Sequence, residues 1–80
     1  MSDVIVRDPV KYVRESIRHH REKIEANSNL GDRFFGETQV YEFASEINRN
    51  QVGVAILHLL KEGFLEMGTG NRIGAYRVKL

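Results

Sequence analysis

Apolar residues recur at alternating spacings of three and four between residues 9 and 26, which is the period of one face of an α-helix. The stripe consists of Val10, Val13, Ile17, His20 and Ile24. Asp8 and Pro9 stand at its start, where an aspartate can accept from free backbone N–H groups and a proline loses no hydrogen bond. The pattern therefore predicts a helix over residues 9–26, ended by the Asn- and Gly-rich residues 27–32.

Two shorter amphipathic stretches follow, over residues 39–47 and 51–62. The first carries Val40, Phe43, Ala44 and Ile47, and the second carries Val52, Ile56, Leu59 and Leu60. The Asn-Arg-Asn of residues 48–50 predicts a turn, because asparagine competes locally for backbone hydrogen bonds. We expect Thr38 to cap the first of these helices and Asn50 to cap the second.

The last part of the chain predicts an antiparallel hairpin. Residues 64–67 and 75–78 alternate in polarity, and the glycine-rich residues 68–74 between them supply positive-φ positions. A third strand is expected from residues 36–38 or from the N-terminal arm, residues 1–8, which contains three β-branched residues in a row.

Phe34 and Phe35 stand in the connector before the second helix. Two adjacent side chains of one strand point to opposite faces. We therefore expect one of these rings to anchor the connector to the core. The other is expected either to cover the end of the first helix or to be exposed for a partner.

The order of helix, turn, helix and hairpin resembles the winged-helix group of helix-turn-helix domains. Its most characteristic piece is the Leu-Leu-Lys-Glu-Gly-Phe-Leu of residues 59–65. The resemblance implies an α+β winged helix with three helices and a small antiparallel β-hairpin wing. Residues 1–80 would form a single domain, divided into an arm (1–8), a first helix (9–26), a helix-turn-helix (39–62) and a wing hairpin (64–80).

Composition narrows the function classes. The 80 residues include no cysteine, and no apolar run reaches the roughly 20 residues of a membrane helix. The first residues lack the basic start and apolar stretch of a secretory signal, so a cytoplasmic location is expected. No phosphate loop, nucleophile elbow or metal-ligand set occurs, and His19 and His20 are adjacent and cannot converge on one ion. We expect no enzyme, no cofactor and no metal.

The candidate site comes from the second helix of the helix-turn-helix, which in this class of domain enters the major groove. Asparagine and glutamine can pair with adenine, arginine with guanine, and an apolar side chain with the thymine methyl. Lysine and histidine suit phosphate, and a basic wing residue often does so in relatives. The expected DNA-contacting residues are Arg49, Asn50, Gln51, Val54, His58, Lys61, Asn71 and Arg72.

Two functions remain open at this stage. The first is a sequence-specific DNA-binding transcriptional regulator that acts by occupying an operator on double-stranded DNA. It would work as a homodimer through the first helix, with the end of the stripe near Ile24 buried against the second copy. The second is a protein-interaction module, because Val54 and Leu57 place apolar side chains on the outward face. The net charge of only +1 means that DNA binding depends on how charge is distributed.

Overall fold

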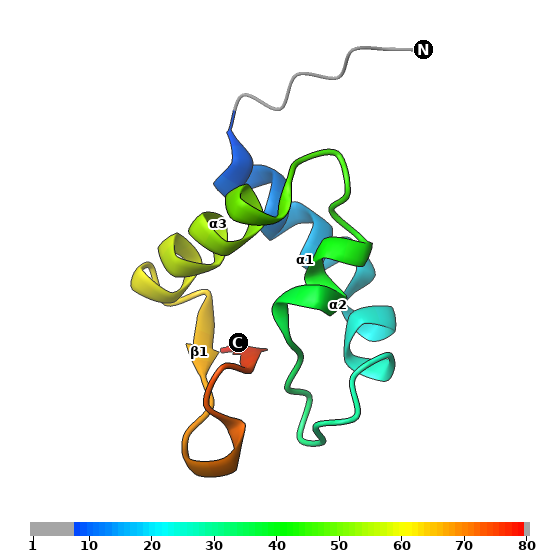
Figure 1. Ribbon diagram of the computed structural model, residues 1–80, viewed down its shortest axis with the longest axis vertical. Coiled ribbons are helices and arrows are strands. Elements are labelled where there is room, and N and C mark those ends of the chain that lie inside the picture. The colour runs from blue at the N-terminus through cyan, green and yellow to red at the C-terminus, as the bar shows by residue number, and fades with distance from the viewer. Residues whose placement is uncertain (1–7, 80) are drawn as a thin grey trace.

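The computed structural model describes residues 8–79, which form three α-helices and a two-stranded antiparallel sheet (Figure 1). This small α+β layout is compatible with a winged helix. Helix α1 spans Pro9–Ala26, as its pattern predicts, and the Asp8 carboxylate accepts a hydrogen bond from the Lys11 backbone N–H at 3.1 Å. The helical backbone is interrupted at His20, whose ring stacks on Phe43 with centroids 5.0 Å apart.

Helices α2 and α3 both begin earlier than the sequence pattern predicts. Helix α2 spans Glu37–Glu42 and α3 spans Arg49–Lys61. The predicted caps, Thr38 and Asn50, lie inside these helices, and the turn is residues 43–48 rather than 48–50.

A reciprocal cap explains where α3 starts. Asn48 Oδ1 accepts from the Gln51 backbone N–H at 2.9 Å, while Gln51 Oε1 accepts from the Asn48 N–H at 3.1 Å. Two N–H groups that would otherwise lack a partner are satisfied in this way. At the start of α2, Gln39 Oε1 accepts from the Gly36 N–H at 2.7 Å.

The core lies where α1 packs against α3 and α2 packs against both. It contains side chains from every α-helix and both strands: Val13, Ile17, Ile24, Phe35, Val40, Ala44, Ile47, Val52, Ala55, Ile56, Leu59, Leu65 and Val78. Gly53 faces α2, where an added Cβ would stand 3.0 Å from Oε1 at the flexible end of the Glu37 side chain.

Three residues of the apolar stripe of α1 are buried in this core. Val13, Ile17 and Ile24 are each 0% exposed within the single chain. The expectation that the stripe near Ile24 buries against a second copy is therefore wrong, because those side chains offer no surface to it. Apart from Ala26 at its end, the exposed positions of α1 are polar or charged, with Arg18 and His19 among them.

The hairpin pairs β1 (Leu65–Met67) with β2 (Tyr76–Val78) in the register Leu65↔Val78. Phe35 adds a bridge on the other side of β2, donating to Tyr76 O at 2.8 Å and accepting from Tyr76 N at 2.7 Å. This third extended element comes from Phe35, not from residues 36–38 as expected. The N-terminal arm, the other candidate strand, lies outside the described residues.

Both connector phenylalanines are buried, Phe34 at 7% exposure and Phe35 at 0%. Phe35 enters the core. Phe34 is covered instead by two guanidinium groups, those of Arg77 at 4.5 Å and Arg72 at 5.4 Å from the ring centroid. The expectation that the second ring covers α1 or is left for a partner is wrong, because the wing supplies its cover.

Within residues 8–79, no helix combines the length and the apolar character needed to cross a membrane.

Candidate nucleic-acid interface

The outward face of α3 is open to solvent along its whole length. Its inward face carries the buried Val52, Ala55, Ile56 and Leu59. Its outward face carries the exposed Asn50, Gln51, Val54, Leu57, His58 and Lys61. The two apolar members, Val54 and Leu57, are 54% and 58% exposed. Five of the six expected α3 contacts thus lie on one open surface, which also includes Leu57.

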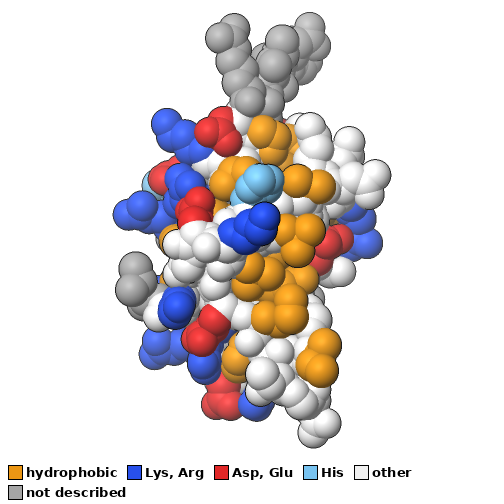
Figure 2. Space-filling model, turned by 90° about the vertical axis from the view of Figure 1, so that its left-hand side faces the viewer, with side chains coloured by type: hydrophobic (Ala, Val, Ile, Leu, Met, Phe, Trp, Pro, Cys, Tyr) orange, Lys and Arg blue, Asp and Glu red, His pale blue; other side chains and the backbone are white. Residues whose placement is uncertain are grey.

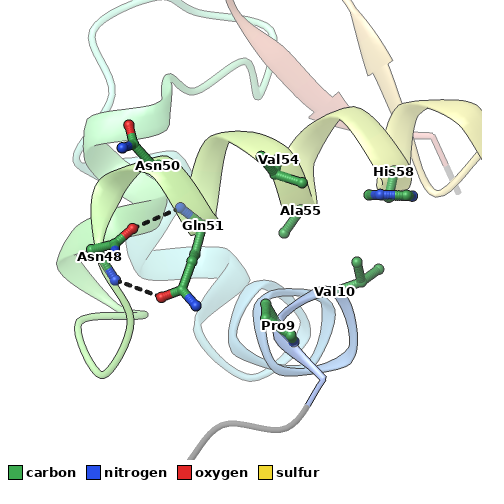
Figure 3. A pocket seen from close by; sticks show the side chains of 8 residues that line it. All are labelled: Pro9, Val10, Asn48, Asn50, Gln51, Val54, Ala55 and His58. Carbon is green, nitrogen blue, oxygen red and sulfur yellow. Dashed lines mark hydrogen bonds between the residues drawn. The ribbon is translucent and has the colours of Figure 1, made fainter.

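Four of the outward residues form a single ridge. At about 100° per residue, positions 50, 54, 57 and 61 fall within a sector of roughly 60°. We call Asn50, Val54, Leu57 and Lys61 the α3 ridge. In Figure 3 the Asn50 side chain projects on the side of α3 away from Pro9, and it makes no hydrogen bond within the described residues.

Two of the predicted base-reading residues are engaged elsewhere. The Arg49 guanidinium donates to Thr38 Oγ1 at 3.0 Å and lies 5.3 Å from the centroid of the Tyr41 ring, so it is directed across α2. Gln51 uses its amide oxygen in the cap of α3 (Figure 3). Bidentate pairing with adenine uses both the oxygen and the NH₂ of the amide, and the Gln51 oxygen already accepts a hydrogen bond within the cap.

The wing arginine is also engaged. Arg72 lies in a short 3₁₀ turn, η1 (Gly70–Arg72), at the end of the hairpin far from α3 (Figure 1). Its guanidinium pairs with Asp32 Oδ2 at 2.9 Å and donates to the Leu30 carbonyl at 3.3 Å. Through these contacts Arg72 holds the wing to the connector. Its neighbour Asn71 is exposed.

An apolar band accompanies the ridge. Figure 2 shows hydrophobic side chains running down the face that carries α3 and β1, with lysine and arginine gathered mainly along one flank. At the N-terminal end of α3 the band opens into a shallow groove against α1, which sequence reasoning did not find. Its lining is Pro9, Val10, Asn48, Asn50, Gln51, Val54, Ala55 and His58 (Figure 3).

Charge is distributed unevenly along the chain. Residues 49–61 and 67–80 contain five basic residues and no acidic one, whereas all 11 acidic residues lie elsewhere. Helix α3 therefore carries only positive charge although the net charge is only +1, whereas Arg72 and Arg77 after β1 are paired with Asp32 and Glu66. Lys61, in the last turn of α3, is exposed and has no carboxylate within salt-bridge distance among residues 8–79. This segregation is a sequence signal that total charge conceals.

The structure shows no candidate metal site among residues 8–79. Across residues 8–79, no three or more histidine, cysteine or acidic side chains gather in a way that could hold an ion.

Comparison with known proteins adds no relative. No protein-family model matches the chain, and no curated protein or solved structure matches it. A fold by itself hosts many functions. The chemistry of the α3 surface is therefore the ground on which a function can be proposed.

Proposed function

We propose that this chain is a winged-helix DNA-binding module that contacts double-stranded DNA with the exposed face of α3 and regulates transcription by occupying its site. The observation that carries the proposal is the open, acid-free outward face of α3. An α-helix fits the major groove of duplex DNA, and any carboxylate on its outer face would be repelled by the phosphates. Every charged side chain of α3 is a cation.

The contacts follow from the available groups. Asn50 and Val54 stand in the N-terminal half of α3, where helix-turn-helix domains meet base edges. Lys61 and His58 stand further along, suited to the phosphate backbone. Asn71, at the wing, is exposed and can donate to a phosphate oxygen.

Fluorescence anisotropy on a labelled duplex at several salt concentrations tests this proposal. The logarithm of the association constant should fall linearly with the logarithm of salt, with a slope of roughly −0.9 for each phosphate neutralised. Lys61→Gln should reduce the magnitude of that slope by about one unit. Lys23→Gln removes a charge from the last turn of α1 and serves as the matched control, with no expected change. Undetectable binding, or binding indifferent to salt, would overturn the proposal.

A second candidate function has its own observation. Val54 and Leu57 are more than half exposed, and with the half-buried Leu60 they line a continuous apolar surface beside His58. Such a surface also suits a protein partner. A complex through this face should be insensitive to salt, unaffected by Lys61→Gln and abolished by Leu57→Asp. DNA binding, in contrast, should weaken as the salt concentration rises.

A further inference from the structure

The α3 ridge has an unusual chemical content for a surface that would read DNA. Of its four members, Asn50 offers a free amide, while Val54 and Leu57 offer only hydrocarbon. The arginine that could read guanine from the first turn, Arg49, is bonded to Thr38. The remaining cation of the ridge, Lys61, lies in the last turn of the helix. Guanine therefore has no dedicated partner at the N-terminal end of α3.

The spacing of the ridge suits consecutive base pairs. With a rise of about 1.5 Å per residue, Asn50 and Val54 stand roughly 6 Å apart along the helix axis, and Val54 and Leu57 roughly 4.5 Å. Successive base pairs of one strand are about 3.4 Å apart. A helix lying along the groove would thus spread these three side chains over about three or four base pairs.

Each of the three side chains matches the same kind of base pair. In the major groove an asparagine amide pairs bidentately with adenine N6 and N7, and an aliphatic side chain packs on the C5-methyl group of thymine. Cytosine lacks that methyl group and presents a polar amino group instead, which an aliphatic side chain leaves without a partner. The apolar character of Val54 and Leu57 thus becomes a means of selection.

Building on the DNA binding proposed above, we propose that α3 selects short A·T runs through the major groove, with Val54 and Leu57 reading thymine methyl groups and Asn50 reading adenine. Val54 and Leu57 would also serve a protein partner in the alternative function. The two hypotheses nevertheless predict different measurements. Only the DNA reading makes affinity depend on a single methyl group of the nucleic acid.

Replacement of thymine by deoxyuridine tests the proposal, because it removes the C5-methyl group and leaves base pairing unchanged. The probes are fluorescein-labelled duplexes with an alternating or a homopolymeric A·T run, each in a thymine form and a deoxyuridine form, and a G·C-run duplex. Anisotropy should show weaker binding to the deoxyuridine form by about fourfold for each methyl group that loses its contact. The G·C-run duplex should bind more weakly than the thymine form.

Variants assign the effect to the ridge. The double variant Val54→Ala, Leu57→Ala should bring the thymine-to-deoxyuridine ratio close to one while keeping the salt dependence of the remaining binding. Both positions are exposed, so thermal unfolding should be nearly unchanged. Ile73→Ala is the matched control, because Ile73 is a 74% exposed apolar residue outside α3 and should leave the ratio unchanged.

The outcomes separate the two levels of the proposal. Salt-dependent binding with equal affinity for thymine and deoxyuridine duplexes would overturn the selection by methyl groups and leave the proposed DNA binding standing. A ratio that persists in the double variant would overturn the assignment to Val54 and Leu57. An absence of salt-dependent binding to every duplex would overturn both the inference and the proposed function.

Discussion

Replacement of Arg72 by alanine should destabilise the protein, although the residue lies in an exposed turn of the wing. Three contacts are lost: the ion pair with Asp32, the hydrogen bond to the Leu30 carbonyl, and the stacking over Phe34. The ion pair is exposed on both sides, at 40% and 64%, so it contributes at most about 1 kcal/mol. The stacking adds roughly 0.5–1 kcal/mol, and the 3.3 Å hydrogen bond adds less than a well-formed one.

Because these contributions overlap, we expect a total loss of about 1–2 kcal/mol in the free energy of unfolding. For a domain of this size each kcal/mol corresponds to roughly 4–8 °C in Tm. Thermal unfolding followed by circular dichroism, together with urea titration, measures both quantities. At high salt, the stability difference between the wild-type protein and Arg72→Ala should shrink by the contribution of the ion pair only, because salt screens exposed charges and leaves the stacking in place.

Two variants serve as controls for Arg72→Ala. Asp32→Asn removes the ion pair alone and keeps a residue that tolerates the positive φ of 53° at this position, so it should cost less than the arginine variant. Arg18→Ala removes a 64% exposed arginine with a 3.8 Å ion pair, and it should change stability by no more than about 0.5 kcal/mol. Equal stability of Arg72→Ala and Arg18→Ala would refute the reasoning. A loss of salt slope in DNA binding on Arg72→Ala, without a loss of stability, would return the residue to the DNA-contacting set.

Three further substitutions probe the parts that position α3, each measured by urea titration. Gly53→Ala should stabilise the protein by roughly 0.5–1 kcal/mol through helix propensity, because only the flexible end of Glu37 must move; a loss would show that this carboxylate is held in place. Asn48→Ala should cost about 1 kcal/mol, because it removes the Oδ1 that accepts from the Gln51 backbone N–H, whereas unchanged stability would indicate that α3 starts later, near residue 51. Gly68→Ala should cost about 1–3 kcal/mol, because the added Cβ overlaps the backbone of the 3₁₀ turn; a neutral result would show that the turn is not closed over this glycine.

The sequence alone determined α1 and the hairpin, whose controlling interactions span only a few residues. Helix α1 spans Pro9–Ala26, as predicted, since its cap at Asp8 and its apolar period are local features. The hairpin strands were predicted to within one residue at their starts. The predicted boundaries of α2 and α3 are wrong, although the signals that set them are also local. For α3, residues 48–50 predict a turn, whereas Asn48 and Gln51 form the reciprocal cap that starts the helix. The outward face of α3 followed from helical period once the helix was recognised.

Some side chains and strand edges have several possible partners, and the local sequence pattern does not choose between them. The tertiary structure makes that choice. An arginine such as Arg72 can bind a phosphate as well as a protein carboxylate. It binds Leu30 and Asp32 here because the fold brings a connector 40 and more residues earlier in the chain next to it. The burial of Phe34 follows from that same approach. The stripe of α1 likewise has one period whether it faces a second copy or its own core. Only the packing of the core settles that Val13 and Ile24 are buried within the chain. Periodicity determines which face of an element is buried, whereas the long-range packing of the chain determines against what.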